Sequence, residues 1–313
     1  MTPAAPAAGA RTATATLIGM SLWLAATVLE SIMVGIVRVV AEDLHPLQVV
    51  FLRMFCGLIV LSPWIAKLGI SGMRTSVFRL HAVRSGLQLV AMAMWFIAVP
   101  IVLLADVAAF NFLAPLFATA GAALFLGEHV RWRRGLALLV GFAGVLVIVR
   151  PGGAFNIGWG LLIASAMLWA GALIVIKRMS ATESSPAMAA WSTLLITPAL
   201  LIPALFVWRE PTWTHWALMF VAGTTGTATH LLIGQAFRYA EASAVMPMDF
   251  FRMIWTTMIG YWVFAQTPTW HTWVGGGLIF AAATYVTLRE ARLARERRAA
   301  ERAAKATAAA GTE

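Results

Sequence analysis

Long apolar runs alternate with short polar stretches along this chain. A helix needs about 20 mostly apolar residues to cross a bilayer. Ten segments read as such spans: 17–40, 46–66, 80–102, 106–126, 135–149, 158–176, 186–207, 216–238, 245–265 and 272–288. The connections between them are too short to hold a soluble domain. The pattern therefore predicts an all-α polytopic membrane protein with ten transmembrane helices.

The composition supports this prediction. Of the 313 residues, 61% are hydrophobic and 12% are charged, and the mean hydropathy is +0.83. Soluble domains carry roughly 25% charged residues. A water-soluble fold has too little interior to bury this much apolar sequence, so we expect the protein to lie in a lipid bilayer.

The basic residues divide unevenly between the two sides that ten spans create. Seventeen lie on the side of the termini: Arg11, Lys67, Arg74, Arg79, Arg131, Arg133, Arg134, Lys177, Arg178, Arg238 and seven from Arg289 to Lys305. Three lie opposite: Arg38, Arg150 and Arg209. Because Lys and Arg concentrate in cytoplasmic loops, both termini are predicted to be cytoplasmic. The net charge of +10 is spread over these loops and the tail, which argues against nucleic acid as a partner.

The two ends of the chain differ from the spans. Residues 1–16 are rich in Ala, Thr and Pro and are predicted to be a disordered leader. A signal peptide is not expected, because the apolar run after Arg11 is too long and contains Glu30. Residues 290–313 are predicted to be a basic cytoplasmic tail. The single cysteine, Cys56, excludes an intramolecular disulfide and is expected to serve packing.

The second half of the chain repeats the order of the first. A shift of 138 or 140 residues aligns five pairs: Glu128 with Gln266, Trp132 with Trp270, Asn111 with Asp249, Arg38 with Arg178, and Pro46 with Pro186. This predicts two five-helix repeats, 17–150 and 157–289. An odd number of spans places the repeats upside down relative to each other. Such repeats can rock about a central site that opens to each side in turn.

Charged residues within the spans are the first candidates for function, because an ion at mid-bilayer costs roughly 3 kcal/mol on insertion scales. Glu30 has no other charge within one helical turn. It suits a proton carrier or a cation contact, or else a structural hydrogen bond. Arg53 suits either a cavity or a structural ion pair. Arg84, near the start of its span, is expected to reach the lipid interface.

Two further spans carry polar candidates. Asp249 and Arg252 are three residues apart and share a helix face, so they can neutralise each other. Arg252 also offers a planar donor fork suited to a carboxylate or phosphate. His230 shares a face with small residues and suits either packing or a proton-linked site. Asn111, near Pro115, marks a possible helix break that frees carbonyl groups toward a cavity.

Other classes of protein find less support. The sequence has no zinc-ligand spacing, no phosphate-binding glycine loop and no nucleophile–histidine–acid set, so no catalytic residue, metal or cofactor is expected. A membrane enzyme acting on lipids remains an alternative, but the six histidines are scattered. A non-transporting scaffold is a second alternative, which the internal duplication argues against. The oligomeric state, monomer or homodimer, stays open.

The segment APLFATAGAALFLGEHVRWRRGLALLVGFAGVLVIVRPG resembles the EamA family of the drug/metabolite transporter superfamily. Its motif residues here are Pro115, Gly127–Glu128 and the glycines of the fifth span. The segment MPMDFFRMIWTTMIGYWVFAQTPTW resembles the matching part of the second repeat. The departure is Gln266, where the family commonly has Glu. Because the arginines after Glu128 also lack counterparts there, we interpret Glu128 as structural.

The resemblance implies a ten-helix carrier in the bacterial inner membrane that moves small organic solutes, driven by a proton gradient or by exchange. LRMFCGLIVLSPW, Glu30 and the Asp249–Arg252 pair look most like the riboflavin and S-adenosylmethionine carriers. We therefore predict a secondary transporter of a small polar metabolite such as an amino acid, vitamin or nucleoside-like solute. Glu30 is the predicted coupling residue. The predicted solute contacts are Arg53, Asn111, His230, Asp249 and Arg252. The spans hold three arginines, Arg53, Arg84 and Arg252, against two acids, Glu30 and Asp249. The excess positive charge favours an anionic or zwitterionic solute.

Overall fold

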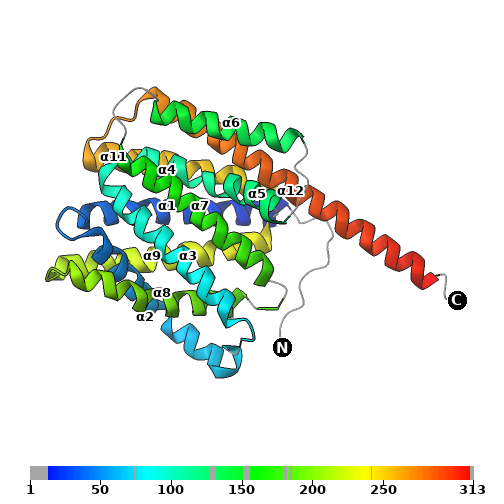
Figure 1. Ribbon diagram of the computed structural model, residues 1–313, viewed down its shortest axis with the longest axis horizontal. Helices are drawn as coiled ribbons and strands as arrows, with labels where there is room; N and C mark the ends of the chain where they lie inside the picture. The colour runs from blue at the N-terminus through cyan, green and yellow to red at the C-terminus, as the bar shows by residue number, and fades with distance from the viewer. Residues whose placement is uncertain are drawn as a thin grey trace.

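The computed structural model describes residues 13–310 except 74, 127–131, 151–155, 180–181, 184 and 241, and in this part the only regular secondary structure is helical. Figure 1 shows the helices running nearly side by side. They are α1 (Ala13–Val40), α2 (Pro46–Gly72), α3 (Phe78–Ala98), η1 (Val99–Ile101), α4 (Leu104–Asn111), α5 (Leu113–Leu126), α6 (Trp132–Val149), α7 (Ile157–Met179), α8 (Ser185–Phe206), α9 (Trp213–Tyr239), α10 (Ala242–Val245), η2 (Met246–Asp249), α11 (Phe250–Phe264) and α12 (Trp270–Ala310).

Within the described residues, seven helical segments are long and apolar enough to cross a bilayer. They are Thr14–Val40, Pro46–Lys67, Phe78–Ile101, Leu104–Gly121, Ile157–Ile176, Ala187–Phe206 and Trp213–Tyr239, and Gly135–Val149 is a shorter apolar helix. The prediction of an all-α polytopic membrane protein is therefore confirmed. The count of ten spans and the inverted arrangement stay predictions.

The predicted span 106–126 is interrupted. Helix α4 ends at Asn111 and α5 begins at Leu113. Pro115 has no backbone N–H to donate to the Asn111 carbonyl four residues earlier, which weakens the helix at this point. The break expected from Asn111 and Pro115 is therefore present.

Helices of the two sequence halves pack on each other. The main contacts join α1 to α9, α3 to α7, and α6 to α12. In Figure 1, α6 and α12 lie side by side along one edge of the bundle. Gly144 and Gly275 let the backbones of that pair approach closely, since a Cβ on either would overlap the carbonyl oxygen of the other. The main hydrophobic core therefore contains residues of both halves, such as Val37 and Ile279.

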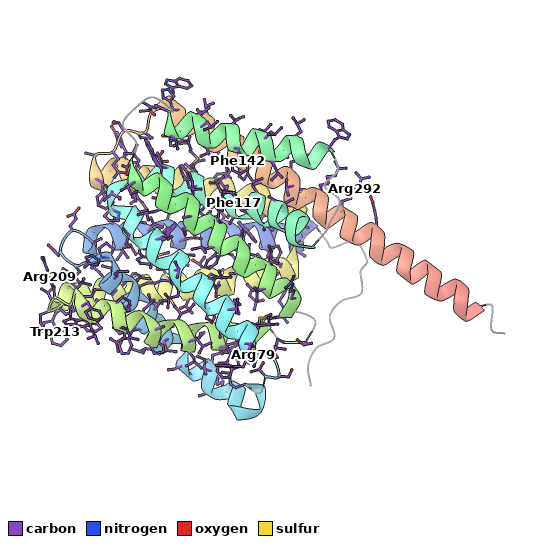
Figure 2. All side chains as sticks on the ribbon, viewed as in Figure 1. Arg79, Phe117, Phe142, Arg209, Trp213 and Arg292 are labelled. Carbon is purple, nitrogen blue, oxygen red and sulfur yellow. The ribbon has the colours of Figure 1, made fainter. Side chains whose placement is uncertain are left out.

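The two ends of the bundle carry different residues. Figure 2 shows Arg209 and Trp213 at one end and Arg79 and Arg292 at the other. Exposed tryptophans lie at helix starts near both ends: Trp213 and Trp270 begin α9 and α12, and Trp132 begins α6. Aromatic belts of this kind mark membrane interfaces. We call the end with Arg209 the outer end and the end with Arg79 the inner end.

Two expectations differ from the structure. Residues 13–16 of the predicted leader already belong to α1. The predicted basic tail had no assigned conformation, and its residues 290–310 continue α12 as a helix. Alanine, arginine and glutamate are strong helix formers, which favours this extension. The expectation for Arg84 was wrong. Its side chain is buried against α8, where Nη1 donates to the Met188 carbonyl at 2.7 Å.

Candidate functional site

Arg252 lies between two carboxylates and is the centre of the candidate site. Its Nη1 is 3.0 Å from Glu30 Oε1 on α1, and its Nη2 is 2.7 Å from Asp249 Oδ1 at the end of η2. The three side chains are 15–19% exposed, so they are partly accessible rather than sealed in the core. This group, Glu30, Asp249 and Arg252, is called the acid–arginine triad below.

Neighbouring bonds fix the triad in place. Trp23 Nε1 on α1 donates to Asp249 Oδ1 at 3.2 Å. One helical position after Glu30, the Ser31 hydroxyl lies 2.9 Å from that of Thr256 and donates to the Arg252 carbonyl at 3.3 Å. These bonds join α1 to η2 and α11, and the Glu30–Arg252 ion pair also connects α1 to α11. Because charged hydrogen bonds are the stronger kind, a change in any triad member is expected to change how these helices pack.

Arg53 reaches from α2 toward α9. Its Nη1 lies 3.1 Å from Met54 Sδ, its buried Nε has no hydrogen-bond partner, and no described acid lies within ion-pair distance. The guanidinium rests on Gly226 of α9, where any Cβ would overlap Nη2. The Arg53 guanidinium therefore has unused donors, which an anionic group could accept from.

His230 follows Gly226 by one helical turn on α9 and belongs to the same polar group. The Arg53 guanidinium rests on Gly226, one turn before His230 on the same helix. Its side chain is exposed, unlike the buried Thr229 beside it. The structure therefore brings five of the six predicted residues together: Glu30, Arg53, His230, Asp249 and Arg252.

Asn111 is the predicted residue that lies apart from this group. Its Oδ1 accepts a hydrogen bond from Trp95 Nε1 at 3.0 Å, which joins α4 to α3. No hydrogen bond or ion pair between described residues connects it to the triad. Asn111 is therefore bonded to Trp95 and not to the triad.

Asp106 was missed by the sequence reasoning. It is 3% exposed and lies near the start of α4, at the outer end. Its Oδ2 accepts from Trp159 Nε1 at 3.1 Å, and its Oδ1 accepts from Thr272 Oγ1 at 2.8 Å. Asp106 thereby joins α4 to α7 and α12. At the edge of a predicted span an acid attracts little notice, because charges are tolerated at the interface.

Glu128 and Gln266 occupy matching positions in the two repeats, and the structure describes only the second of them. Glu128 lies outside the described residues. Gln266 Oε1 accepts from the Leu104 backbone N–H at 2.9 Å and so satisfies a free donor in the first turn of α4. The amide at this position has a structural role at the outer end.

A family model described as "EamA-like transporter family" matches residues 17–150 and 156–288, most of the chain. The chain belongs to the EamA-like transporter family. This membership makes it a multi-pass membrane protein and a transporter, not an enzyme.

Curated relatives of this EamA chain are bacterial transporters. It is 31% identical over 247 residues to a riboflavin transporter of Vibrio cholerae, covering 77% of this chain and 83% of the relative. It is 27% identical over 275 residues to an S-adenosylmethionine uptake transporter of Rickettsia bellii, covering 87% and 94%. A pseudopaline exporter of Pseudomonas aeruginosa is 24% identical, with coverages of 84% and 94%. The EamA chain is therefore a transporter of small metabolites.

The fold also matches a solved structure titled "Crystal structure of protein". The TM-score is 0.59 at 19% sequence identity, over 89% of this chain and 98% of that one. This similarity supports the EamA chain's fold and carries no information about its solute.

Proposed function

We propose that the protein moves a small polar organic metabolite across the bacterial inner membrane by alternating access between two inverted five-helix repeats. The observation that carries the proposal is the acid–arginine triad. Arg252 of the second repeat binds Glu30 of the first, so the ion pair joins the two units that must move relative to each other.

The triad suggests how a solute and a proton are coupled. Glu30, Asp249, Arg53 and Arg252 are formally neutral together when both acids are ionised. When Glu30 takes up a proton, it releases one side of the Arg252 fork and leaves the group with an excess positive charge. A carboxylate or phosphate of the solute can then occupy the place that Glu30 held. Protonation of Glu30 and binding of an anionic group therefore favour each other.

The names of the relatives guide the choice of solutes. Riboflavin, S-adenosylmethionine and pseudopaline are all polar organic molecules that differ widely in charge. A shared fold does not determine a shared solute. The first step is a thermal-shift screen of the purified protein against vitamins, nucleosides and amino acids, followed by uptake of the best compound into proteoliposomes.

Coupling is tested in the same proteoliposomes with an imposed pH gradient. We expect Glu30→Gln to bind and exchange the solute while losing the response to the gradient, because the amide carries no proton. Arg252→Ala should raise KM by about tenfold or more, since hydrogen bonds to charged groups contribute roughly 1.5–3 kcal/mol. Glu42→Gln and Arg238→Ala are matched controls, because both residues are exposed and neither belongs to the triad.

The outcomes separate the two parts of the proposal. If Glu30→Gln responds to the gradient as the native protein does, Glu30 is not the coupling residue. If no metabolite in the panel enters proteoliposomes of the native protein, the transport proposal fails for these solutes as a class.

A further inference from the structure

The outer end contains a largely apolar cavity, with a few charged and amide groups, that lies apart from the triad. Its volume is about 250 Å³. Its lining combines ionic, amide and apolar groups: Arg38, Pro100, Ile101, Val102, Leu103, Asp106, Asn156 and Trp159. Ile101 is 44% exposed, so the lining extends to the surface of the bundle. A second space of about 230 Å³ shares Leu103, Asp106 and Trp159 and adds Arg150.

The opposite charges in this lining do not pair with each other. Arg38 Nη1 donates to the carbonyls of Val99 and Val102, and its guanidinium lies 5.2 Å from the Phe264 ring centre. Arg150 donates to Thr269. Among the described residues, no ion pair joins Asp106 to either arginine.

Asp106 has capacity for a further donor. Each of its oxygens accepts one hydrogen bond, from Trp159 and Thr272, whereas an ionised carboxylate offers about four acceptor positions. Arg38 likewise uses one of its three nitrogens in the recorded contacts, and a guanidinium has five donors. A carboxylate and a guanidinium therefore face one space, each with bonding capacity left.

We propose that this outer cavity binds a small zwitterion of amino-acid size. Its ammonium group lies on Asp106, its carboxylate on Arg38, and its apolar part against Trp159 and Leu103. A solute with a single charge satisfies one of these groups and leaves the other partly buried without a counter-ion, which is unfavourable. The inference rests on the proposed transport function, since it makes the cavity the outer stopping point of the solute.

The charge requirement can be measured with three probes of the same shape. Phenylalanine carries both charges, 2-phenylethylamine lacks the carboxylate, and 3-phenylpropionate lacks the amine. Binding is measured on the full chain in nanodiscs by equilibrium dialysis of radiolabelled phenylalanine, with the other two as competitors. We expect phenylalanine to bind about tenfold or more tightly than either analogue, because each analogue loses one charged contact.

Two variants test which residue binds each charged group of the zwitterion. Asp106→Asn should remove the preference for phenylalanine over 3-phenylpropionate, and Arg38→Gln should remove the preference over 2-phenylethylamine. Glu210→Gln and Arg209→Gln make the same charge changes at exposed outer-end positions and should keep both preferences. Only monodisperse protein is scored. If Asp106→Asn is not monodisperse, Arg38→Gln carries the test, because its predicted loss is equally specific.

The results that overturn the inference are defined separately from those for transport. Equal affinity for the three probes, or an unchanged preference in Arg38→Gln, removes the zwitterion site. Loss of phenylalanine binding in Arg252→Ala with full binding in Arg38→Gln moves the site to the triad and also overturns it. Phenylalanine binding without uptake of any metabolite contradicts the proposed transport function and leaves the outer site standing.

Discussion

Arg53 has its position because Gly226 has no side chain. The guanidinium rests on the α9 backbone at this point, and an added Cβ would overlap Nη2. The overlap is with the far end of a flexible side chain, so Gly226→Ala should displace Arg53 without unfolding the bundle. We expect KM for the transported solute to rise about tenfold, as for loss of one charged contact. The measurement is uptake kinetics in proteoliposomes at equal expression.

Gly234 provides the matched control for Gly226. It lies two helical turns further along α9, and no atom outside its local backbone lies within 4 Å of an added Cβ. Gly234→Ala should leave KM unchanged. If both alanine variants raise KM equally, the effect belongs to the α9 backbone and not to Arg53.

Residue by residue, the sequence identified polar groups better than their partners. The spacing of Asp249 and Arg252 predicted their ion pair, which the structure confirms. The partner of Arg252 on α1, Glu30, is 222 positions away, and no local pattern reports such a distance. Asn111 was expected among the solute contacts from its place beside a helix break, but its recorded bond goes to Trp95.

At the level of helices, α6 and α12 form a pair whose approach depends on glycine. A Cβ on Gly275 would overlap the Gly144 carbonyl oxygen and the Ile148 side chain. Gly275→Ala should therefore force the two backbones apart and destabilise the protein by about 1–3 kcal/mol, the usual cost of overpacking. The expected result is a lower Tm of the detergent-solubilised protein.

Gly277 tests whether this cost comes from the helix contact. It belongs to α12, two residues beyond Gly275, and an added Cβ meets no atom within 4 Å. Gly277→Ala should match or slightly exceed the native Tm, because alanine favours a helix over glycine by roughly 1 kcal/mol. A similar loss in both variants would contradict the packing explanation.

Apolar runs predicted the existence of helices well and their ends less well. The break after Asn111 followed from Pro115, whose missing N–H is a local property of the sequence. The helical continuation of α12 past residue 289 did not follow, because a run of arginines reads as a solvated tail. Short elements such as α10 and η2 depend on the packing around Asp249, which lies beyond local patterns.

For the whole molecule, the uneven distribution of basic residues predicts one orientation. The single cysteine, Cys56, is 2% exposed, so a Cys56→Ala background is expected to fold and to be free of thiols. In intact cells, an impermeant maleimide should label Glu210→Cys at the outer end. It should label Arg79→Cys at the inner end only after permeabilisation. The reverse pattern would place both termini outside and contradict the positive-inside prediction.

The two indole–carboxylate bonds have a consequence for the energetics of transport. Trp23 binds Asp249 and Trp159 binds Asp106, and each bond joins a helix of one sequence half to a helix of the other. Asp249 lies toward the inner end and Asp106 toward the outer end. If the protein alternates access as we propose, a conformation open at one end would break one bond and keep the other, so the two open states would lose similar interactions. Their free energies would then lie close to each other, and both states would be populated.

Replacing each of the two tryptophans should shift the equilibrium between the outward-open and inward-open states, in opposite directions for the two variants. Trp159→Phe should favour the outward-open state and Trp23→Phe the inward-open state, each by about tenfold, the effect of one hydrogen bond to a charged acceptor. The measurement is the maleimide labelling rate of Asn156→Cys, which lines the outer cavity, in the Cys56→Ala background. Rates that change in the same direction would mean that the bonds serve stability alone. Rates that change in opposite directions would show that single substitutions can shift the equilibrium between the outward-open and inward-open states either way.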